Sequence, residues 1–221
     1  MAQSCCSRGI DRHFSAARAR DELRRYRRRG PTGTARRLLR LLNRAQVRAD
    51  TLLDVGGGIG VLDHELLAGG LGAAVHVEVA AAYLEAAREE ATRRGRADRI
   101  TFVAGDIVDI APQLAPADLV MLDRVLCCYP ALESLVQSTA AKARHYWAAS
   151  FPRDHWLPKV QMRWENARRA RAGDPFRSFV HPVRTIYALL GAAGLAPVLI
   201  HRGLFWEAVL CARTNHGPAH E

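Results

Sequence analysis

A mainly apolar run at residues 52–55 ends in a glycine-rich turn at residues 56–60. The spacing of the glycines in this turn suits contact with a nucleoside cofactor. Glycines at alternate positions after such a run permit positive backbone φ angles and leave N–H groups uncovered at the start of the following helix. The positive end of that helix favours a carboxylate. The sequence therefore predicts a cofactor site at this turn, built from Asp54, Gly56, Gly57, Gly58 and Gly60.

The spacing differs from the dinucleotide fingerprint G-x-G-x-x-G. Counted from Gly56, the third glycine would fall at Val61, and counted from Gly58 it would fall at Asp63. Neither position holds a glycine, so the spacing does not favour a nicotinamide dinucleotide.

Acidic residues follow three further predicted strands. Glu78 follows the strand at 73–77 and lies 22 residues after Gly56; Asp106 follows the strand at 99–105, and Asp123 the strand at 118–122. The carboxyl ends of parallel strands meet at one sheet edge, so these acids are expected to share one crevice. Glu78 suits the hydroxyls of a ribose and Asp106 the amino group of an adenine. Each acid taken singly is more typical of a helix N-cap or a solvated loop, so the prediction depends on the ordered combination of the three.

The remaining pattern predicts alternating helices and strands. We expect helices at 62–67, 80–94 and 185–193, and later strands at 146–151, 196–200 and 206–212. The link between the last two strands is short enough to demand a hairpin, so the last strand should be antiparallel. An excursion at 152–182 is longer than a simple connection. We expect it to form a helix at 160–171 and a roof over the substrate pocket.

In this order of motifs, residues 50 to 212 resemble the class I S-adenosylmethionine-dependent methyltransferases. The resemblance implies an α/β, Rossmann-like fold with a seven-stranded, mostly parallel sheet and an antiparallel last strand, preceded here by a helical N-terminal arm. It also implies S-adenosyl-L-methionine as cofactor. The residues that it assigns to the cofactor are Asp54 with the glycine turn for the methionine part, Glu78 and Val79 for the ribose, Asp106 and Ile107 for the adenine, and Asp123 and Arg124 for closing the site.

The basic charge of the chain is confined to the arm. Residues 1–50 hold 14 arginines against four acidic residues, whereas residues 51–221 carry 18 positive and 18 negative side chains. We therefore divide the chain into an arm at 1–49, a methyltransferase domain at 50–213 and a tail at 214–221. The arm predicts helices at 15–29 and 34–44, with Thr34 as a possible N-cap.

Two functions remain open for this arm. Arg24 to Arg29 could grip phosphates with Tyr26 stacked on a base, which would make the protein a nucleic-acid (RNA) methyltransferase. The leucines at 38, 39, 41 and 42 instead predict a helix docked on the domain as a lid, with a solvated basic face. No Asn/Asp-Pro-Pro-Tyr/Phe sequence follows the fourth strand, which disfavours methylation of a base amino group. The lid is therefore preferred, with nucleic acid an unlikely partner.

A closer resemblance is to the magnesium-protoporphyrin O-methyltransferases and the bacterial proteins grouped around them. It rests on Gly30-Pro31-Thr32 in the arm and on residues 122–130, Leu-Asp-Arg-Val-Leu-Cys-Cys-Tyr-Pro. The porphyrin enzymes carry His-Tyr-Pro where this chain has Cys128-Tyr129-Pro130. The resemblance implies a small-molecule acceptor, either aromatic or carboxylated, without fixing a porphyrin.

Methyl transfer is an in-line displacement, so the protein mainly aligns the acceptor and excludes water. A carboxylate acceptor needs no base, whereas a phenol or an amine does. We predict Tyr129 and His181 as catalytic groups. For the substrate we predict Tyr26 from the arm, with Arg153 and Arg177 binding an acidic group bidentately.

The composition indicates neither a membrane protein nor a metal site. No apolar run approaches the roughly 18 residues of a membrane span, and the N-terminus lacks the apolar middle of a signal peptide, so a cytoplasmic location is expected. The vicinal pairs Cys5-Cys6 and Cys127-Cys128 suit neither ordinary disulfides nor a tetrahedral zinc site, and free thiols are preferred. The alternative is that the second pair supplies a nucleophile, as in cytosine methylation. The sequence predicts no oligomeric state.

Overall fold

The computed structural model describes residues 9–31 and 33–214. Cys5, Cys6, Thr32 and the tail beyond Thr214 lie outside the described residues, and so do the predictions that fall on them. Within the described part, no helix is both long and apolar enough to cross a membrane.

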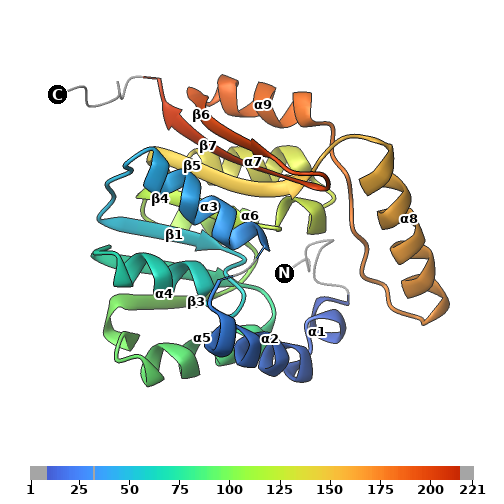
Figure 1. Ribbon diagram of the computed structural model, residues 1–221, viewed down its shortest axis with the longest axis horizontal. Helices are drawn as coiled ribbons and strands as arrows, with labels where there is room; N and C mark the ends of the chain where they lie inside the picture. The colour runs from blue at the N-terminus through green and yellow to red at the C-terminus, as the bar shows by residue number, and fades with distance from the viewer. Residues whose placement is uncertain (1–8, 32, 215–221) are drawn as a thin grey trace.

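The core is a single seven-stranded sheet in the order β3-β2-β1-β4-β5-β7-β6 (Figure 1). β7 is antiparallel to both β5 and β6, while the other neighbouring strands are parallel. This confirms the predicted sheet and its antiparallel last strand. The strands are β1 (Thr51–Val55), β2 (Ala73–Glu78), β3 (Ile100–Ala104), β4 (Ala117–Asp123), β5 (Ala143–Pro152), β6 (Leu195–Arg202) and β7 (Trp206–Arg213).

Helices cover both faces of this sheet, so the described chain has three layers. The longer helices after the arm are α4 (Val61–Ala68), α5 (Ala81–Arg93), α7 (Leu132–Ala140), α8 (Trp156–Arg171) and α9 (Val183–Ala192), and short turns include α6 (Ile107–Ile110) and η3 (Leu126–Cys128). One face packs apolar side chains of α3 (Gly33–Arg44), α4 and α5 against the strands. The other face packs α6, α7 and α9 around the buried Trp147 and Phe151.

The excursion after β5 contains a longer helix than the sequence predicted. α8 begins at Trp156 instead of residue 160, because Pro158 is tolerated in a first turn and the ring of His155 accepts a hydrogen bond from the N–H of Leu157 at 3.4 Å. α9 also begins earlier than predicted, at Val183 instead of residue 185, directly after Pro182. α8 stands away from the sheet at one side of the molecule (Figure 1).

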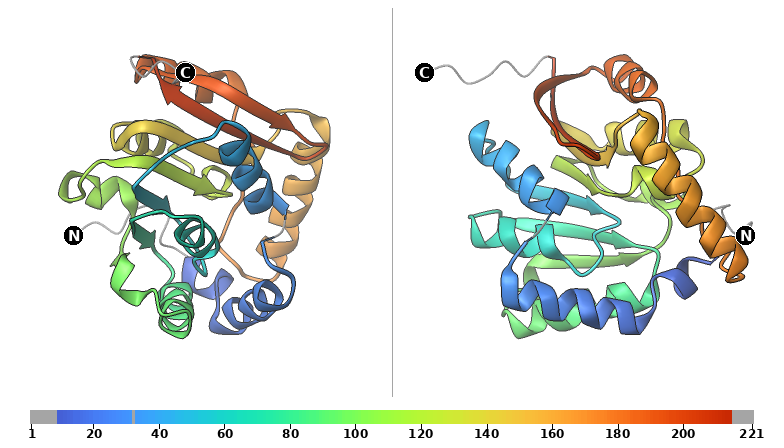
Figure 2. Two further views of the ribbon diagram at one scale, coloured as in Figure 1. Left: turned by 60° about the vertical axis from the view of Figure 1, so that its left-hand side comes forward. Right: turned by 45° about the vertical axis from the view of Figure 1, so that its right-hand side comes forward.

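The arm consists of α1 (Ile10–His13), α2 (Ala16–Arg29) and α3 (Gly33–Arg44). α3 packs Leu38, Leu41 and Leu42 against the sheet, and all three are buried. Thr34 lies inside α3 and is not its cap. Figure 2 shows α2 alongside α5, where Leu23 is also buried.

Polar contacts hold α2 to α5 as well. Glu90 of α5 is buried and accepts hydrogen bonds from Arg27 of α2 and from Arg93 and Arg94. Burial alone would raise the pKa of Glu90, but these guanidinium groups lower it to about 2. The carboxylate is therefore charged at neutral pH, and it fixes the arm against the domain.

Candidate functional site

The glycine turn after β1 has a backbone that glycine favours. Gly56, Gly58 and Gly60 have φ angles of 62°, 62° and 79°. A Cβ at Gly57 would lie 2.7 Å from an oxygen of Asp54 and 2.5 Å from the ring of His76. The turn thus presses against side chains below it, and its upper side lines two cavities.

Asp54 lies beneath this turn as a buried carboxylate, and neither of its oxygens has a hydrogen-bond partner among the described residues. Burial and the nearby charge of Asp63 raise its pKa well above the ordinary value. Asp63 is 2.6 Å from Nδ1 of His76, and this pairing raises the pKa of His76 although burial opposes it. A cationic group above Asp54 would therefore stabilise its charged form.

Asp54, Asp63 and His76 also form a group whose donor atoms lie within 4.8 Å of one another, as a metal site requires. Asp63 and His76 are hydrogen-bonded to each other within this group. The contact uses one ligand atom from each residue, so the arrangement favours a structural ion pair beneath the turn.

Glu78, at the end of β2, holds the turn by its backbone. Its two carboxylate oxygens accept from the N–H of Gly58 at 2.9 Å and from the N–H of Ala80 at 2.8 Å. Each oxygen keeps a further lone pair, so the carboxylate can still accept hydroxyl groups from the cavity that it lines. Val79, the next residue, lines the same cavity and is 37% exposed.

Asp106 caps α6 by accepting from the N–H of Val108 at 3.0 Å. The hydroxyl of Tyr129 lies 3.0 Å from both oxygens of the same carboxylate. Tyr129 is buried, and this hydroxyl orients Asp106 at the cavity wall. Ile107 is buried in the core behind it.

Asp123 and Arg124 form a turn at the end of β4, opposite the glycine turn. Asp123 accepts from the Ser150 hydroxyl at 2.5 Å and lies 3.7 Å from Nε of Arg124. Arg124 has a φ of 62°, which is unusual for a side-chain-bearing residue. That backbone directs its guanidinium to both cavities.

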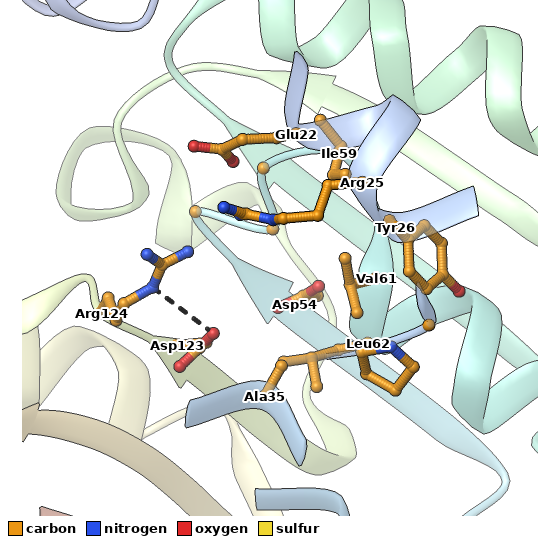
Figure 3. A pocket seen from close by; sticks show the side chains of 15 residues that line it. Glu22, Arg25, Tyr26, Ala35, Asp54, Ile59, Val61, Leu62, Asp123 and Arg124 are labelled. Carbon is orange, nitrogen blue, oxygen red and sulfur yellow. Dashed lines mark ion pairs between the residues drawn. The ribbon is translucent and has the colours of Figure 1, made fainter. Parts of the chain in front are cut away.

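The smaller cavity, of about 80 Å³, is covered by α2. In Figure 3, Arg25 of α2 extends over the glycine turn toward Arg124, and Asp54 lies below. Tyr26 also lines this cavity, but its hydroxyl donates to Glu65 at 2.7 Å and its ring lies beneath the guanidinium of Arg94. Tyr26 therefore secures the arm.

The larger cavity, of about 320 Å³, adjoins the smaller one through Gly56, Gly58 and the Asp123–Arg124 turn. Aromatic rings and three guanidinium groups surround it. The rings are those of His13, Phe14, Tyr83, Tyr129, Phe176 and Trp206, and the guanidinium groups are those of Arg18, Arg124 and Arg169.

Three residues predicted to act on the substrate do not line this cavity. Arg153 donates to the carbonyl of Gly203 at 3.1 Å, and Arg177 donates to backbone carbonyls of residues 174 and 176. Nε2 of His181 lies 3.0 Å and 2.9 Å from the carbonyl oxygens of Leu126 and Tyr129, so it holds the η3 turn. The arginines found in their place come from α2 and from the inner side of α8, where Arg18 and Arg169 carried no local sequence signal.

Cys127 and Cys128 are free thiols at the cavity wall, as preferred from the sequence. Their sulfur atoms are 3.8 Å apart, and each lies within hydrogen-bond distance of the carbonyl of Arg124. Cys211 is a further free thiol, buried in the core.

Residues 31–133 match the family model for the O-methyltransferase domain. The matched residues make up a little under half of the chain and include the glycine turn, Glu78, Asp106 and Asp123. The fold of the whole described chain is that of the class I S-adenosylmethionine-dependent methyltransferases. The solved structures with the same fold include a magnesium protoporphyrin IX methyltransferase from Synechocystis PCC 6803 with bound S-adenosylhomocysteine, which is 18% identical, covers 92% of this chain and 98% of its own and has a TM-score of 0.69. No curated protein matches the chain.

Two further methyltransferase structures share the fold. An O-methyltransferase family protein from Burkholderia thailandensis is 18% identical over 95% of this chain and 64% of its own, with a TM-score of 0.68. Human N-acetylserotonin methyltransferase in complex with S-adenosylmethionine is 16% identical over 91% of this chain and 57% of its own, with a TM-score of 0.61.

S-adenosylmethionine is bound in the structure of the human enzyme, and the site described above fits this cofactor. The unpartnered carboxylate of Asp54 suits the cationic methionine end, and the free lone pairs of Glu78 suit hydroxyl groups. Gly56, Gly57 and Gly58, which lie between them, have no side chains that would block a ligand.

Proposed function

We propose that this protein is an S-adenosylmethionine-dependent methyltransferase that O-methylates a flat aromatic small molecule carrying an acidic group. The observation that supports the proposal is the lining of the larger cavity, where aromatic rings lie beside guanidinium groups. The guanidinium of Arg18 lies 5.5 Å from the ring of Phe14, and that of Arg169 lies 5.3 Å from the ring of Phe176. The ring of Phe176 stacks on that of His13 with the ring centroids 4.1 Å apart, and it meets the ring of Phe14 edge-on with the centroids 5.4 Å apart. Such rings favour a flat apolar acceptor, and guanidinium groups favour a carboxylate on it.

The assignment of the cofactor residues belongs to this proposal. Arg25 and Asp54 would hold the carboxylate and the ammonium of the methionine part in the smaller cavity. Glu78 would hold the ribose and Asp106 the adenine, with Tyr129 as a positioning residue for Asp106. The bound cofactor supplies an electrophilic methyl group, and the protein aligns the acceptor oxygen and excludes water.

We place the general base at His13, from α1. Its Nδ1 lies 3.2 Å from Asp174, and its Nε2 accepts from a guanidinium nitrogen of Arg18 at 2.9 Å. Nε2 becomes free to take a proton when Arg18 turns from His13 to the acidic group of the acceptor. Burial lowers the pKa of His13 despite Asp174, so the ring is neutral at pH 7 and can accept a proton. Tyr129 and His181 stay predictions as catalytic groups, but their polar atoms already hold Asp106 and the η3 turn.

A His13→Gln variant tests this role. With a phenol acceptor we expect kcat to fall by about 100-fold or more, because general-base catalysis typically contributes a factor of 10² to 10⁴. With an aromatic carboxylate as acceptor, which needs no base, kcat of the variant should stay close to that of the parent. In the parent, kcat for the phenol should fall as the pH drops through a value below 6.5, because His13 then becomes protonated. An equal loss with both acceptors would contradict the assignment.

An Arg18→Gln variant tests the acidic acceptor. We expect KM for a hydroxylated aromatic acid to rise about tenfold to 100-fold, since a charge-assisted hydrogen bond contributes about 1.5–3 kcal/mol. KM for the methyl ester of the same compound should change little. Arg20→Gln, at an exposed position on α2 outside the cavity, is the matched control. Equal KM changes for acid and ester would exclude charge recognition by Arg18.

A further inference from the structure

α8 has two chemically different sides. Its inner side contributes Met162 and Arg169 to the larger cavity. On its outer side, Trp156, Val160 and Trp164 follow one another at intervals of four residues and form one stripe. Their exposed fractions are 72%, 58% and 61%. Large apolar side chains so exposed point to a surface that contacts something else.

The stripe continues onto a second element. Leu204, at the tip of the β6–β7 hairpin, is 75% exposed. The ring of His155, just before α8, lies 2.9 Å from the carbonyl oxygen of Leu204, so the tip adjoins the start of the helix. Trp156, Val160, Trp164 and Leu204, which we call the α8 patch, account for four of the six exposed large apolar residues in the described part of the chain.

Basic side chains accompany the α8 patch. Arg163, Arg168 and Arg171 are exposed on α8, and the guanidinium of Arg168 lies 5.4 Å from the ring of Trp164. The acid of this helix, Glu165, faces the larger cavity and pairs with Arg169. Asp154, just before the helix, is paired with Lys159. The outer side of α8 is therefore apolar along its stripe and positive at its margins.

We propose that the α8 patch binds the surface of an anionic lipid bilayer. Tryptophan favours the boundary between headgroups and acyl chains, and basic side chains beside it are attracted by anionic lipid. A second copy of the chain is less suitable, because a two-fold contact through the middle of α8 would place Arg163 against its own copy. The helix would lie in the plane of the interface with the α8 patch inserted.

This orientation has a consequence for the site. Met162 and Arg169 line the larger cavity from the opposite side of the same helix. An α-helix with its side chains is about 10–12 Å across. The cavity wall would therefore lie one helix diameter from the lipid, which suits an acceptor that partitions into membranes.

Flotation with vesicles tests the proposal on the full chain. We expect the protein to float with phosphatidylcholine vesicles that contain phosphatidylglycerol, and to float poorly with phosphatidylcholine alone. W156S/W164S should lower the partition constant about tenfold or more, and R163Q/R168Q/R171Q should lower it while weakening its dependence on salt. Val198→Ser is the matched control, because Val198 is 52% exposed on β6 outside the α8 patch.

Binding of S-adenosylhomocysteine checks that each variant is folded, since none of these residues lines either cavity. Absence of vesicle binding by the parent would overturn the proposal. Equal binding of the parent and W156S/W164S would also overturn it. A parent dimer in light scattering that W156S/W164S converts to monomer, without vesicle binding, would assign the α8 patch to a second copy instead.

Discussion

Glu78→Ala should weaken the binding of S-adenosylhomocysteine by at least about 2 kcal/mol, or roughly thirtyfold. The substitution removes the acceptor proposed for the ribose. It also releases the N–H groups of Gly58 and Ala80, which the carboxylate holds at 2.9 Å and 2.8 Å. The cofactor would thus lose a direct contact and part of the shape of the turn. Isothermal titration calorimetry measures the change.

Glu85→Ala is the matched control, because Glu85 is an exposed glutamate on the neighbouring α5 and lines neither cavity. The Glu85→Ala variant should bind S-adenosylhomocysteine with the same affinity as the parent. At a hundredfold excess over Kd, the cofactor should stabilise the parent by about 2.7 kcal/mol, and nicotinamide dinucleotides should not stabilise it. If Glu78→Ala binds the cofactor as tightly as Glu85→Ala does, Glu78 is not the ribose acceptor.

The sheet and its acidic edge could be predicted because they depend on local patterns. Alternating strands and helices determine a parallel sheet, and parallel strands bring Glu78, Asp106 and Asp123 to one edge whatever the packing around them. The hairpin link likewise determined the direction of β7. The predicted helix ends were less accurate. At α8 the start was missed because capping by His155 and tolerance of Pro158 depend on local geometry.

The substrate side of the site could not be predicted in the same way. Arg153 and Arg177 carry the same group as Arg18 and Arg169, yet the first pair is bonded to backbone carbonyls. The difference arises from packing of the arm and α8 around the cavity, which no local pattern encodes. His13 was missed because α1 has four residues and no apolar period.

A Gly57→Ala variant should lower the free energy of unfolding by about 2–3 kcal/mol, within the range for overpacking a buried site. The added Cβ would lie 2.5 Å from the ring of His76 and 2.7 Å from Asp54. His76 cannot move away cheaply, because it is buried and bonded to Asp63 at 2.6 Å. The strain must therefore shift the turn, and cofactor affinity should fall as well. Urea unfolding and calorimetry measure the two effects.

Gly191→Ala provides the contrast within the same chain. Gly191 lies in α9 with no atom within 4 Å of its added Cβ, so the substitution should stabilise the protein by up to about 1 kcal/mol through helix propensity. The same chemical change is thus expected to have opposite signs at the two positions. If Gly57→Ala unfolds at the urea concentration of the parent, the turn does not press on Asp54 and His76. The glycine turn would then not be the rigid cover that keeps the buried carboxylate of Asp54 available to a cationic ligand.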